Sequence, residues 1–174
     1  SEQISLAGKE ASGTSNMKFM MNGAVTLGTL DGANVEISNF VGEDNAVIFG
    51  MREEEVKAIK FNGSYNPFDI YNSDPQIKAV MDSLLDGTFS SDHEQFRMIF
   101  DEIMYRNDEF MVLKDLESYL QGCKKIESDY LNRDKWGREC LVNIACSGWF
   151  SSDRTIAEYN RDIWHLKKIH WWIT

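Results

Sequence analysis

The sequence is poor in basic residues, and it lacks long apolar runs. Lysine and arginine total 18 against 28 aspartates and glutamates, which gives a formal net charge of −10. This acidic balance argues against nucleic acid or an anionic membrane surface as a partner. No apolar run approaches the ~20 residues that cross a bilayer, and no signal-peptide pattern opens the chain. We therefore expect a globular chain that acts neither on nucleic acid nor in a membrane.

Cysteine and histidine are also scarce, with 3 of each. The histidines are scattered and have no acidic or cysteine partner at ligand spacing, so we expect no metal site. Cys123, Cys140 and Cys146 are an odd number without metal-ligand spacing, which favours reduced thiols in a cytoplasmic compartment. We expect Cys140 and Cys146 to be core residues of an apolar helix.

One short stretch, EASGTSNMKFMMNG from Glu10 to Gly23, places a small-residue turn before a methionine-rich segment with a single lysine. Gly13 allows backbone conformations that are closed to other residues, and Thr14 or Ser15 can cap a helix that runs from Asn16 onward. In that helix the methionines share one face. Residues 14, 18 and 22 form an adjacent polar stripe, because they are spaced by four.

A lysine is an unexpected neighbour for a helix N-terminus, which offers unpaired N–H groups and a positive dipole end. Such an end suits a phosphate. Partial desolvation of Lys18 by the methionines would favour the neutral amine, the form that reacts with an aldehyde. Together these features suggest a phosphorylated aldehyde cofactor, of which pyridoxal phosphate is the familiar example. The same spacing is also explained by a helix-capping loop with a solvated lysine and no ligand. The residues alone do not decide between these two interpretations.

The same stretch, followed by AVTLGTLDGANVEI, resembles the cofactor-lysine signature of the glycogen and starch (α-glucan) phosphorylases. IFGMR, from Ile48 to Arg52, and FSSDRTIAEYNRDIW, from Phe150 to Trp164, resemble further segments of that family in the same order. The resemblance covers nearly the whole chain. It implies an α/β fold: a partial, C-terminal doubly wound (Rossmann-like) domain of the glycosyltransferase-B type, mostly helical here, with a short parallel sheet remnant.

The resemblance also implies roles for the residues of the first motif. The implied catalytic residues are Lys18 and Thr14: Lys18 matches the lysine that holds pyridoxal 5'-phosphate as an imine, and Thr14 matches a residue that cradles the cofactor phosphate. Gly13 and Ser15 complete the cofactor-binding set. Ser15 stands where many family members have glycine, and its side chain is tolerated only if φ is negative. The segment that grips the transferred glucose matches Glu10, Ala11, Ser12 and Gly13.

The implied activity is that of an α-1,4-glucan phosphorylase, a glycosyltransferase that releases glucose 1-phosphate from glycogen, starch or maltodextrin. Its partners are the glucan and inorganic phosphate, and the parent enzyme is expected to be a cytoplasmic homodimer. The chain resembles only about the last fifth of such an enzyme, and nothing in it matches the glucan-binding domain or the basic residues that position the attacking phosphate. We therefore expect a fragment that is inactive by itself and could self-associate.

Two other classes of function remain open from the residues. One is a non-enzymatic helical module that binds a partner chain. The other is a different pyridoxal phosphate enzyme that forms an imine, in which the lysine would shuttle protons. We treat residues 1–174 as one partial domain, with the cofactor loop, its helix and the short strands in residues 1–50 and a helical part in residues 51–174.

Hydrophobic periodicity predicts two short strands and five amphipathic helices beyond the Lys18 helix. The strands lie at residues 24–30 and 46–50, and a DGAN turn follows the first. The helices begin near residues 74, 92, 115, 135 and 151. We expect a buried stripe on these helices, made of Ile77, Val80, Leu84, Phe96, Ile99, Phe100, Leu120 and Ile144. We also expect the aromatic tail, residues 165–174, to pack back onto the domain.

Overall fold

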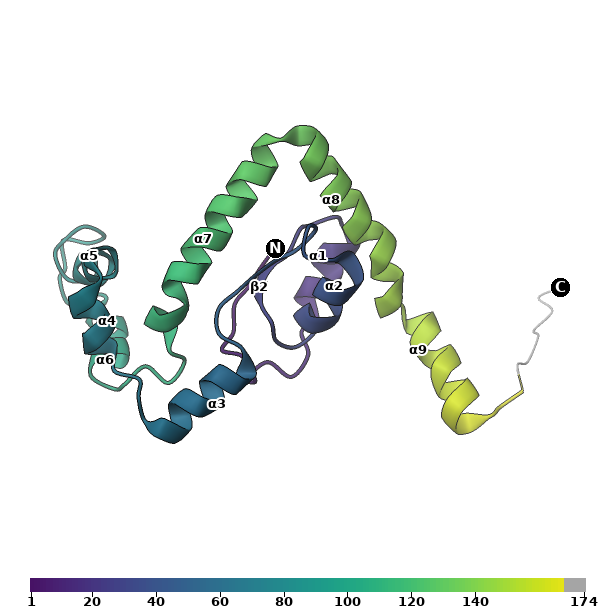
Figure 1. Cartoon of the computed structure of the whole chain (residues 1–174), viewed down its shortest axis with the longest axis horizontal. Helices are drawn as coiled ribbons and strands as arrows, with labels where there is room; N and C mark the ends of the chain where they lie inside the picture. Colours follow the sequence, from purple (N-terminus) through teal and green to yellow (C-terminus); the bar gives the residue numbers. More distant parts are fainter. Residues whose placement is uncertain (168–174) are drawn as a thin grey trace.

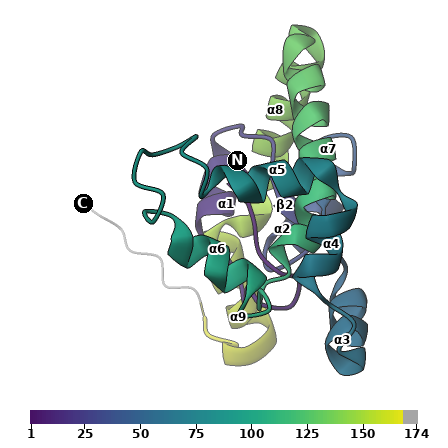
Figure 2. The same cartoon turned by 90° about the vertical axis from the view of Figure 1, so that its left-hand side faces the viewer.

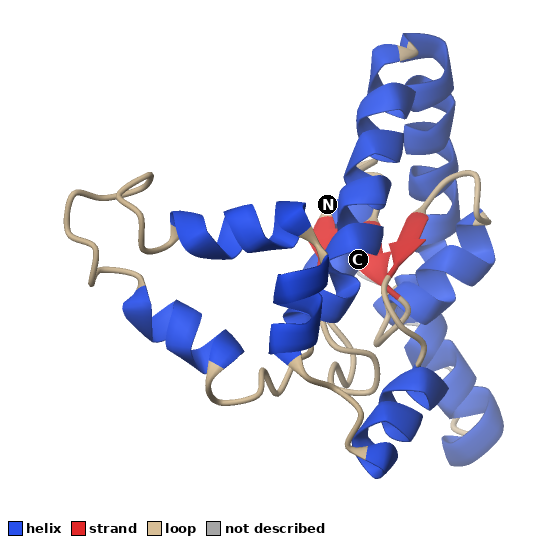
Figure 3. Cartoon of the chain, turned by 60° about the vertical axis from the view of Figure 1, so that its left-hand side comes forward, coloured by secondary structure: helices blue, strands red, loops and turns tan. Residues whose placement is uncertain are grey.

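A small parallel sheet lies at the centre of the computed structural model, which describes residues 1–167. Its three strands are β1 (Glu2–Gln3), β2 (Leu27–Thr29) and β3 (Val47–Phe49), in the order β1-β2-β3. Leu27 pairs with Glu2 on one side and with Val47 on the other, and both pairings are parallel (Figure 3). The predicted α/β class with a short parallel sheet is confirmed.

Helices make up most of the remaining chain (Figure 1). They are α1 (Ser15–Met21), α2 (Asn34–Val41), α3 (Glu53–Asn62), α4 (Pro67–Ser73), α5 (Pro75–Ser83), α6 (Arg97–Met104), α7 (Val112–Leu131), α8 (Arg133–Cys146) and α9 (Ser152–Tyr159). A 3-10 helix, η1 (Ser147–Phe150), joins α8 to α9, and a π-helical turn, η2 (Asn160–Trp164), follows α9.

The two faces of the sheet carry different helices because successive side chains of a strand point to opposite sides. Leu27, Val47 and Phe49 are buried against α7. A Cβ on Gly122 would lie 2.7 Å from Leu27 Cδ1, so this glycine lets α7 approach the strands closely. The other face contributes Ala46 to a second cluster, in which buried residues of α1 and α2 pack against α8 and η1.

All five predicted helices form, although their ends differ from the sequence pattern. Asp74 caps α5 as expected, because its Oδ1 accepts the backbone N–H groups of Gln76 (2.8 Å) and Ile77 (3.2 Å). The pattern missed β1, α2, α3 and α4. Strand β1 has only two residues, and α2 and α3 each bury only a few side chains, so their periodic signal is weak.

The predicted buried stripe is only partly correct. Ile77 is buried, and Leu84, Phe96 and Phe100 are half-buried. Val80, Ile99, Leu120 and Ile144 are exposed, so the prediction was wrong for these four. Helices α4, α5 and α6 meet α7 around its first turns, where Ile77, Met81, Met104 and Leu113 form a compact cluster (Figure 2). Helices α5 and α6 are buried where they touch this cluster, whereas Val80 of α5 and Ile99 of α6 lie beyond it and are exposed.

The last described elements extend away from the rest of the molecule (Figure 1). Neither α9 nor η2 contains a buried residue. The expected packing of the aromatic tail concerns residues 165–174, and its tryptophans, Trp171 and Trp172, lie outside the described residues. Among residues 1–167 no helix is both long and apolar enough to span a membrane. The three cysteines are free and half-buried, so the predicted core position of Cys140 and Cys146 holds only in part.

A buried carboxylate on α8 should make stability depend on pH. Neither oxygen of Glu139 accepts a hydrogen bond within the described chain, and the Lys135 ammonium lies 3.6 Å from Oε1. Burial raises the pKa of Glu139, and the nearby negative charge of Asp129 raises it further. A raised pKa means that the stabilising contribution is present below the unfolded pKa and is lost as pH rises through the folded one.

We therefore expect Glu139→Gln to gain stability relative to the unmodified chain as pH rises from 4 to 8, since the amide cannot ionise. Urea unfolding at a series of pH values measures this difference. Glu127→Gln, an exposed acid on α7, is the control and should show a flat difference. A Glu139→Gln difference that is constant across the range would contradict the assignment of a raised pKa.

Candidate functional site

Helix α1 carries Lys18 on an exposed face. Thr14 precedes the helix, and the backbone N–H of Lys18 donates to the Thr14 carbonyl at 3.2 Å. Thr14, Lys18 and Asn22 are all exposed, which confirms the predicted polar stripe. The Lys18 ammonium group makes no ion pair or hydrogen bond within residues 1–167, so its amine is available to a ligand.

Two details of the predicted helix are wrong. Thr14 occupies the N-cap position, but no side-chain hydroxyl caps the helix. The methionines do not cover Lys18, because Lys18 is an exposed residue, and Met21 is itself 55% exposed. The reason is that α1 buries only a narrow stripe, made of Asn16 and Met20, and Lys18 lies on the opposite, exposed side.

The glycine of the loop before α1 behaves as the sequence predicted. Gly13 has a φ of +105°, a conformation that residues with a Cβ rarely adopt. Ser15 is not among the residues with positive φ, so its side chain is accommodated without backbone strain. Its hydroxyl donates to Gln3 Oε1 at 3.1 Å, which ties the start of α1 to strand β1.

Backbone donors without a protein partner lie at the first turn of α1, and those of Thr14 and Ser15 belong to exposed residues. The N–H groups of Thr14, Ser15 and Asn16 have no hydrogen-bond partner within the described residues, whereas the Met17 N–H donates to Asn16 Oδ1 at 2.9 Å. The Thr14 hydroxyl is likewise free of protein partners in this part of the chain. The exposed donors of Thr14 and Ser15 therefore lie one turn before an uncommitted amine, an arrangement that suits an anionic ligand.

Asp31, two residues after β2, holds the segment that leads into this loop. Its Oδ2 accepts the Glu10 N–H (2.8 Å), the Lys9 N–H (3.1 Å) and the Ser5 hydroxyl (3.0 Å). Burial favours the neutral acid, but these bonds favour the carboxylate, and together they hold the pKa of Asp31 below its ordinary value. The charged form of Asp31 therefore fixes the backbone at Glu10.

Residues 10–12 lie directly on the turn that follows β2. The Ala33 N–H donates to the Ser12 carbonyl at 2.7 Å. Gly32 has a φ of +50°, and a Cβ at this position would lie 2.3 Å from the Ser12 oxygen. Glu10, Ala11 and Ser12 are exposed, so their side chains remain accessible while their backbone is held.

Two buried asparagines join α1 to the sheet. Asn16 Nδ2 donates to Asn34 Oδ1 at 2.9 Å, and Asn34 Nδ2 donates to the Thr29 carbonyl at 3.0 Å. Both side chains are nearly inaccessible to solvent. A small cavity of about 90 Å³ lies beside them, and its lining includes Glu10, Gly13 and Ser15. The structure thus brings the predicted cofactor and glucose segments together around one recess, while Lys18 lies one turn further along α1.

The family model of the carbohydrate phosphorylases matches residues 1–166. The chain belongs to the carbohydrate phosphorylase family. The glycogen phosphorylase of Bacillus subtilis (strain 168) is 52% identical over 167 residues, which cover 96% of this chain and 21% of that protein. The brain form of glycogen phosphorylase from Mus musculus is 48% identical over 96% of this chain and 20% of that protein. The maltodextrin phosphorylase of Streptococcus pneumoniae is 48% identical over 95% of this chain and 22% of that protein.

The chain therefore spans about a fifth of the length of the curated phosphorylases that it matches. The resemblance identified from the Lys18 motif is confirmed as family membership. The four supporting residues Asn16, Asp31, Gly32 and Asn34 were missed as part of the site by sequence reasoning. The sequence analysis assigned DGAN, from Asp31 to Asn34, to a turn. Asp and Asn side chains often bond to the backbone in turns, and this preference is the signal that could have pointed to Asp31 and Asn34.

Proposed function

We propose that this chain is the cofactor-binding part of an α-1,4-glucan phosphorylase, a glycosyltransferase that releases glucose 1-phosphate from glycogen, starch or maltodextrin. The observation that carries the proposal is the family match over residues 1–166, which includes the Lys18 motif. The names of the relatives include both glycogen and maltodextrin phosphorylases, so the preferred glucan stays open.

Pyridoxal 5'-phosphate is the cofactor we propose, held covalently by the exposed amine of Lys18 and by the donors before it. The free N–H groups of Thr14 and Ser15 and the hydroxyl of Thr14 suit its phosphate, and the positive φ of Gly13 turns the backbone there. When bound, the cofactor would supply its phosphate group as a proton donor and acceptor to the inorganic phosphate that attacks the glycosidic bond.

We propose that the Glu10–Gly13 segment binds the transferred glucose. The exposed carboxylate of Glu10 would accept hydrogen bonds from sugar hydroxyls, and Ala11, Ser12 and Gly13 would contribute largely backbone donors. The support for this role is the backbone held by Asp31 and Gly32, since a fixed loop loses less entropy when it binds. A preformed loop of this kind would orient the sugar next to the cofactor phosphate.

The glucan and inorganic phosphate are the proposed partners of the longer protein, which we expect to be a cytoplasmic homodimer. We keep residues 1–174 as one partial domain of it. Phosphorolysis needs the cofactor, a bound inorganic phosphate and a bound glucan at the same time. The motifs identified in this chain are those of the cofactor-binding part of the site. We therefore propose that the isolated chain releases no glucose 1-phosphate from glycogen, although its exposed apolar surface could let it self-associate.

The test is chemical labelling of the isolated chain. We expect incubation with pyridoxal 5'-phosphate, borohydride reduction and peptide mapping to place most of the label on Lys18, because the amine follows the phosphate donors by one turn of the same helix. Thr14→Ala should weaken the labelling, since it removes a hydroxyl beside the phosphate. Lys124→Ala, an exposed lysine on α7, is the control and should leave the labelling of Lys18 unchanged.

Label spread evenly over Lys9, Lys57, Lys124 and Lys125 would mean that the chain holds no cofactor site. Release of glucose 1-phosphate by the isolated chain, abolished in Lys18→Ala, would instead contradict the proposed inactivity and leave the cofactor site intact.

A further inference from the structure

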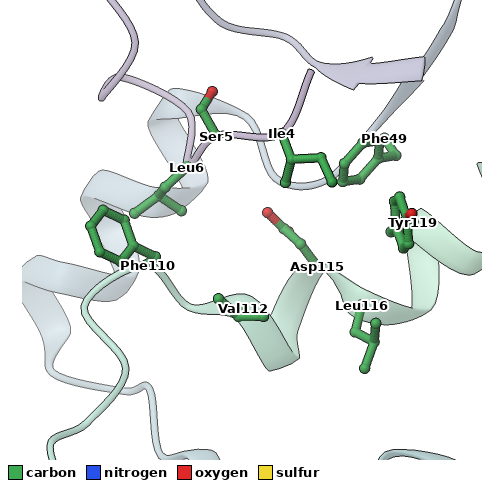
Figure 4. Close-up of a pocket in the computed structure, with 9 residues that line it drawn as sticks. All are labelled: Ile4, Ser5, Leu6, Phe49, Phe110, Val112, Asp115, Leu116 and Tyr119. Atoms are coloured by element: carbon green, nitrogen blue, oxygen red, sulfur yellow. The ribbon is translucent and has the colours of Figure 1, made fainter. Parts of the chain in front are cut away.

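A second cavity, separate from the Lys18 loop, lies between the end of the sheet and the start of α7 (Figure 4). It has a volume of about 390 Å³ and opens to solvent beside Phe110. Its apolar walls come from Ile4, Leu6, Phe49, Val112, Leu116 and Tyr119. Residues 4–6 follow β1 and Phe49 ends β3, so the cavity lies at the carboxyl edge of the parallel strands, where ligands of such sheets bind.

One carboxylate interrupts these apolar walls. Asp115 Oδ1 accepts the Met51 N–H at 2.9 Å, while Oδ2 has no hydrogen-bond partner among residues 1–167. Figure 4 shows the carboxylate directed into the space between Ile4, Leu6 and Phe49. A Cβ on Gly50 would lie 2.8 Å from Oδ2, so the glycine keeps the neighbourhood of this oxygen free of a side chain.

The surroundings of Asp115 favour a cation. Burial raises the pKa of Asp115, which means that its negative charge is incompletely compensated where it lies. Glu55 and Asp108 add negative charge nearby, and Lys114 opposes them. Lys114 is exposed, and its ammonium group makes no ion pair with Asp115. A positive group beside Oδ2 would relieve this imbalance.

We propose that this cavity binds a small aromatic amine, with its ring against the apolar walls and its ammonium group on Asp115 Oδ2. The volume lies within the range of small-molecule sites, which are mostly apolar with a few convergent polar groups. Phe49, Phe110 and Tyr119 provide faces and edges for an aromatic ring, and aromatic faces attract a cation as well. An anionic or a neutral polar ligand would leave the carboxylate uncompensated.

The inference is independent of the cofactor site, because Lys18 does not line this cavity. The experiment therefore titrates the isolated chain with 2-phenylethylamine and, as the matched neutral probe, with 2-phenylethanol. Isothermal titration calorimetry gives the two affinities. We expect the amine to bind roughly tenfold or more tightly than the alcohol, the difference expected of a partly buried charged hydrogen bond.

Three variants locate the binding. Asp115→Asn keeps an oxygen for the Met51 N–H and should lower the amine affinity to that of the alcohol. Glu117→Gln removes the same charge from an exposed position on α7 and should change neither affinity. Phe110→Ala removes a wall residue that is 55% exposed, so folding should survive while both probes bind more weakly.

Equal affinities of the amine and the alcohol would overturn the proposal, as would an amine affinity that Asp115→Asn leaves unchanged. Binding that Phe110→Ala does not weaken would place the amine outside this cavity and overturn it too. Failure of the amine to bind at all has the same consequence, and none of these outcomes depends on pyridoxal 5'-phosphate.

Discussion

Gly32→Ala is expected to destabilise the chain strongly and to suppress cofactor labelling at Lys18. The positive φ of +50° alone costs a residue with a Cβ about 1–3 kcal/mol. The added Cβ would also lie 2.3 Å from the Ser12 carbonyl oxygen, a backbone atom that cannot rotate away. The Glu10–Ser12 segment must therefore move, and with it the loop before α1. Urea unfolding measures the first effect, and reductive labelling measures the second.

The chain offers a matched control for this change. Gly63 has a φ of +60°, and nothing lies within 4 Å of a Cβ built there. Gly63→Ala should therefore show the free-energy cost of a positive φ without any steric clash. Gly63 lies at the end of α3, away from the loop before α1. If Gly32→Ala and Gly63→Ala lower the free energy of unfolding by the same amount, the close approach of Ser12 to Gly32 contributes nothing to stability. The loop would then not be held by this contact.

Asn34→Ala is expected to cost about 1–3 kcal/mol, because it leaves buried Asn16 Nδ2 without its partner and removes one of the two hydrogen bonds that the Thr29 carbonyl accepts. The loss should also loosen α1, since Asn16 lies in its first turn. A double-mutant cycle with Asn16→Ala isolates the bond between the two side chains. We expect the double variant to be more stable than the sum of the single changes predicts.

Asn45→Ala is the control for this cycle. Its side chain is half-buried and donates one hydrogen bond, to the Val41 carbonyl at 2.8 Å, so it should cost less and show no coupling with Asn16→Ala. Additive effects of the Asn16 and Asn34 changes would mean that the buried pair does not join the helix to the sheet.

The local features of the site were predictable where one residue decides them. Gly13 was predicted to take a conformation closed to other residues, and it does so with a φ of +105°. Asp74 was predicted to cap α5, and its carboxylate accepts two backbone N–H groups. Capping and turn preferences depend on neighbours in sequence, so they can be assigned without knowledge of the fold.

Burial was predicted less well because it depends on which surfaces meet. Val80 shares the apolar stripe of α5 with Ile77, and Ile99 belongs to a similar stripe on α6, yet Val80 and Ile99 are 49% and 47% exposed while Ile77 is buried. A helix buries only the part of its stripe that another element covers, and periodicity does not say how long that part is. The same reasoning explains why Lys18 was expected beside desolvating methionines and is exposed.

The sequence by itself determined the family, through motifs that extend along nearly the whole chain, together with the parallel α/β class and the positions of five helices. Only the tertiary structure revealed that Asp31, Gly32 and Asn34 hold the Glu10–Asn16 segment, and that Asp115 faces an apolar cavity. The physical reason is distance along the chain. These contacts join residues that are many positions apart, such as Asp31 with Glu10 and Asp115 with Met51, and chain folding alone decides whether they meet.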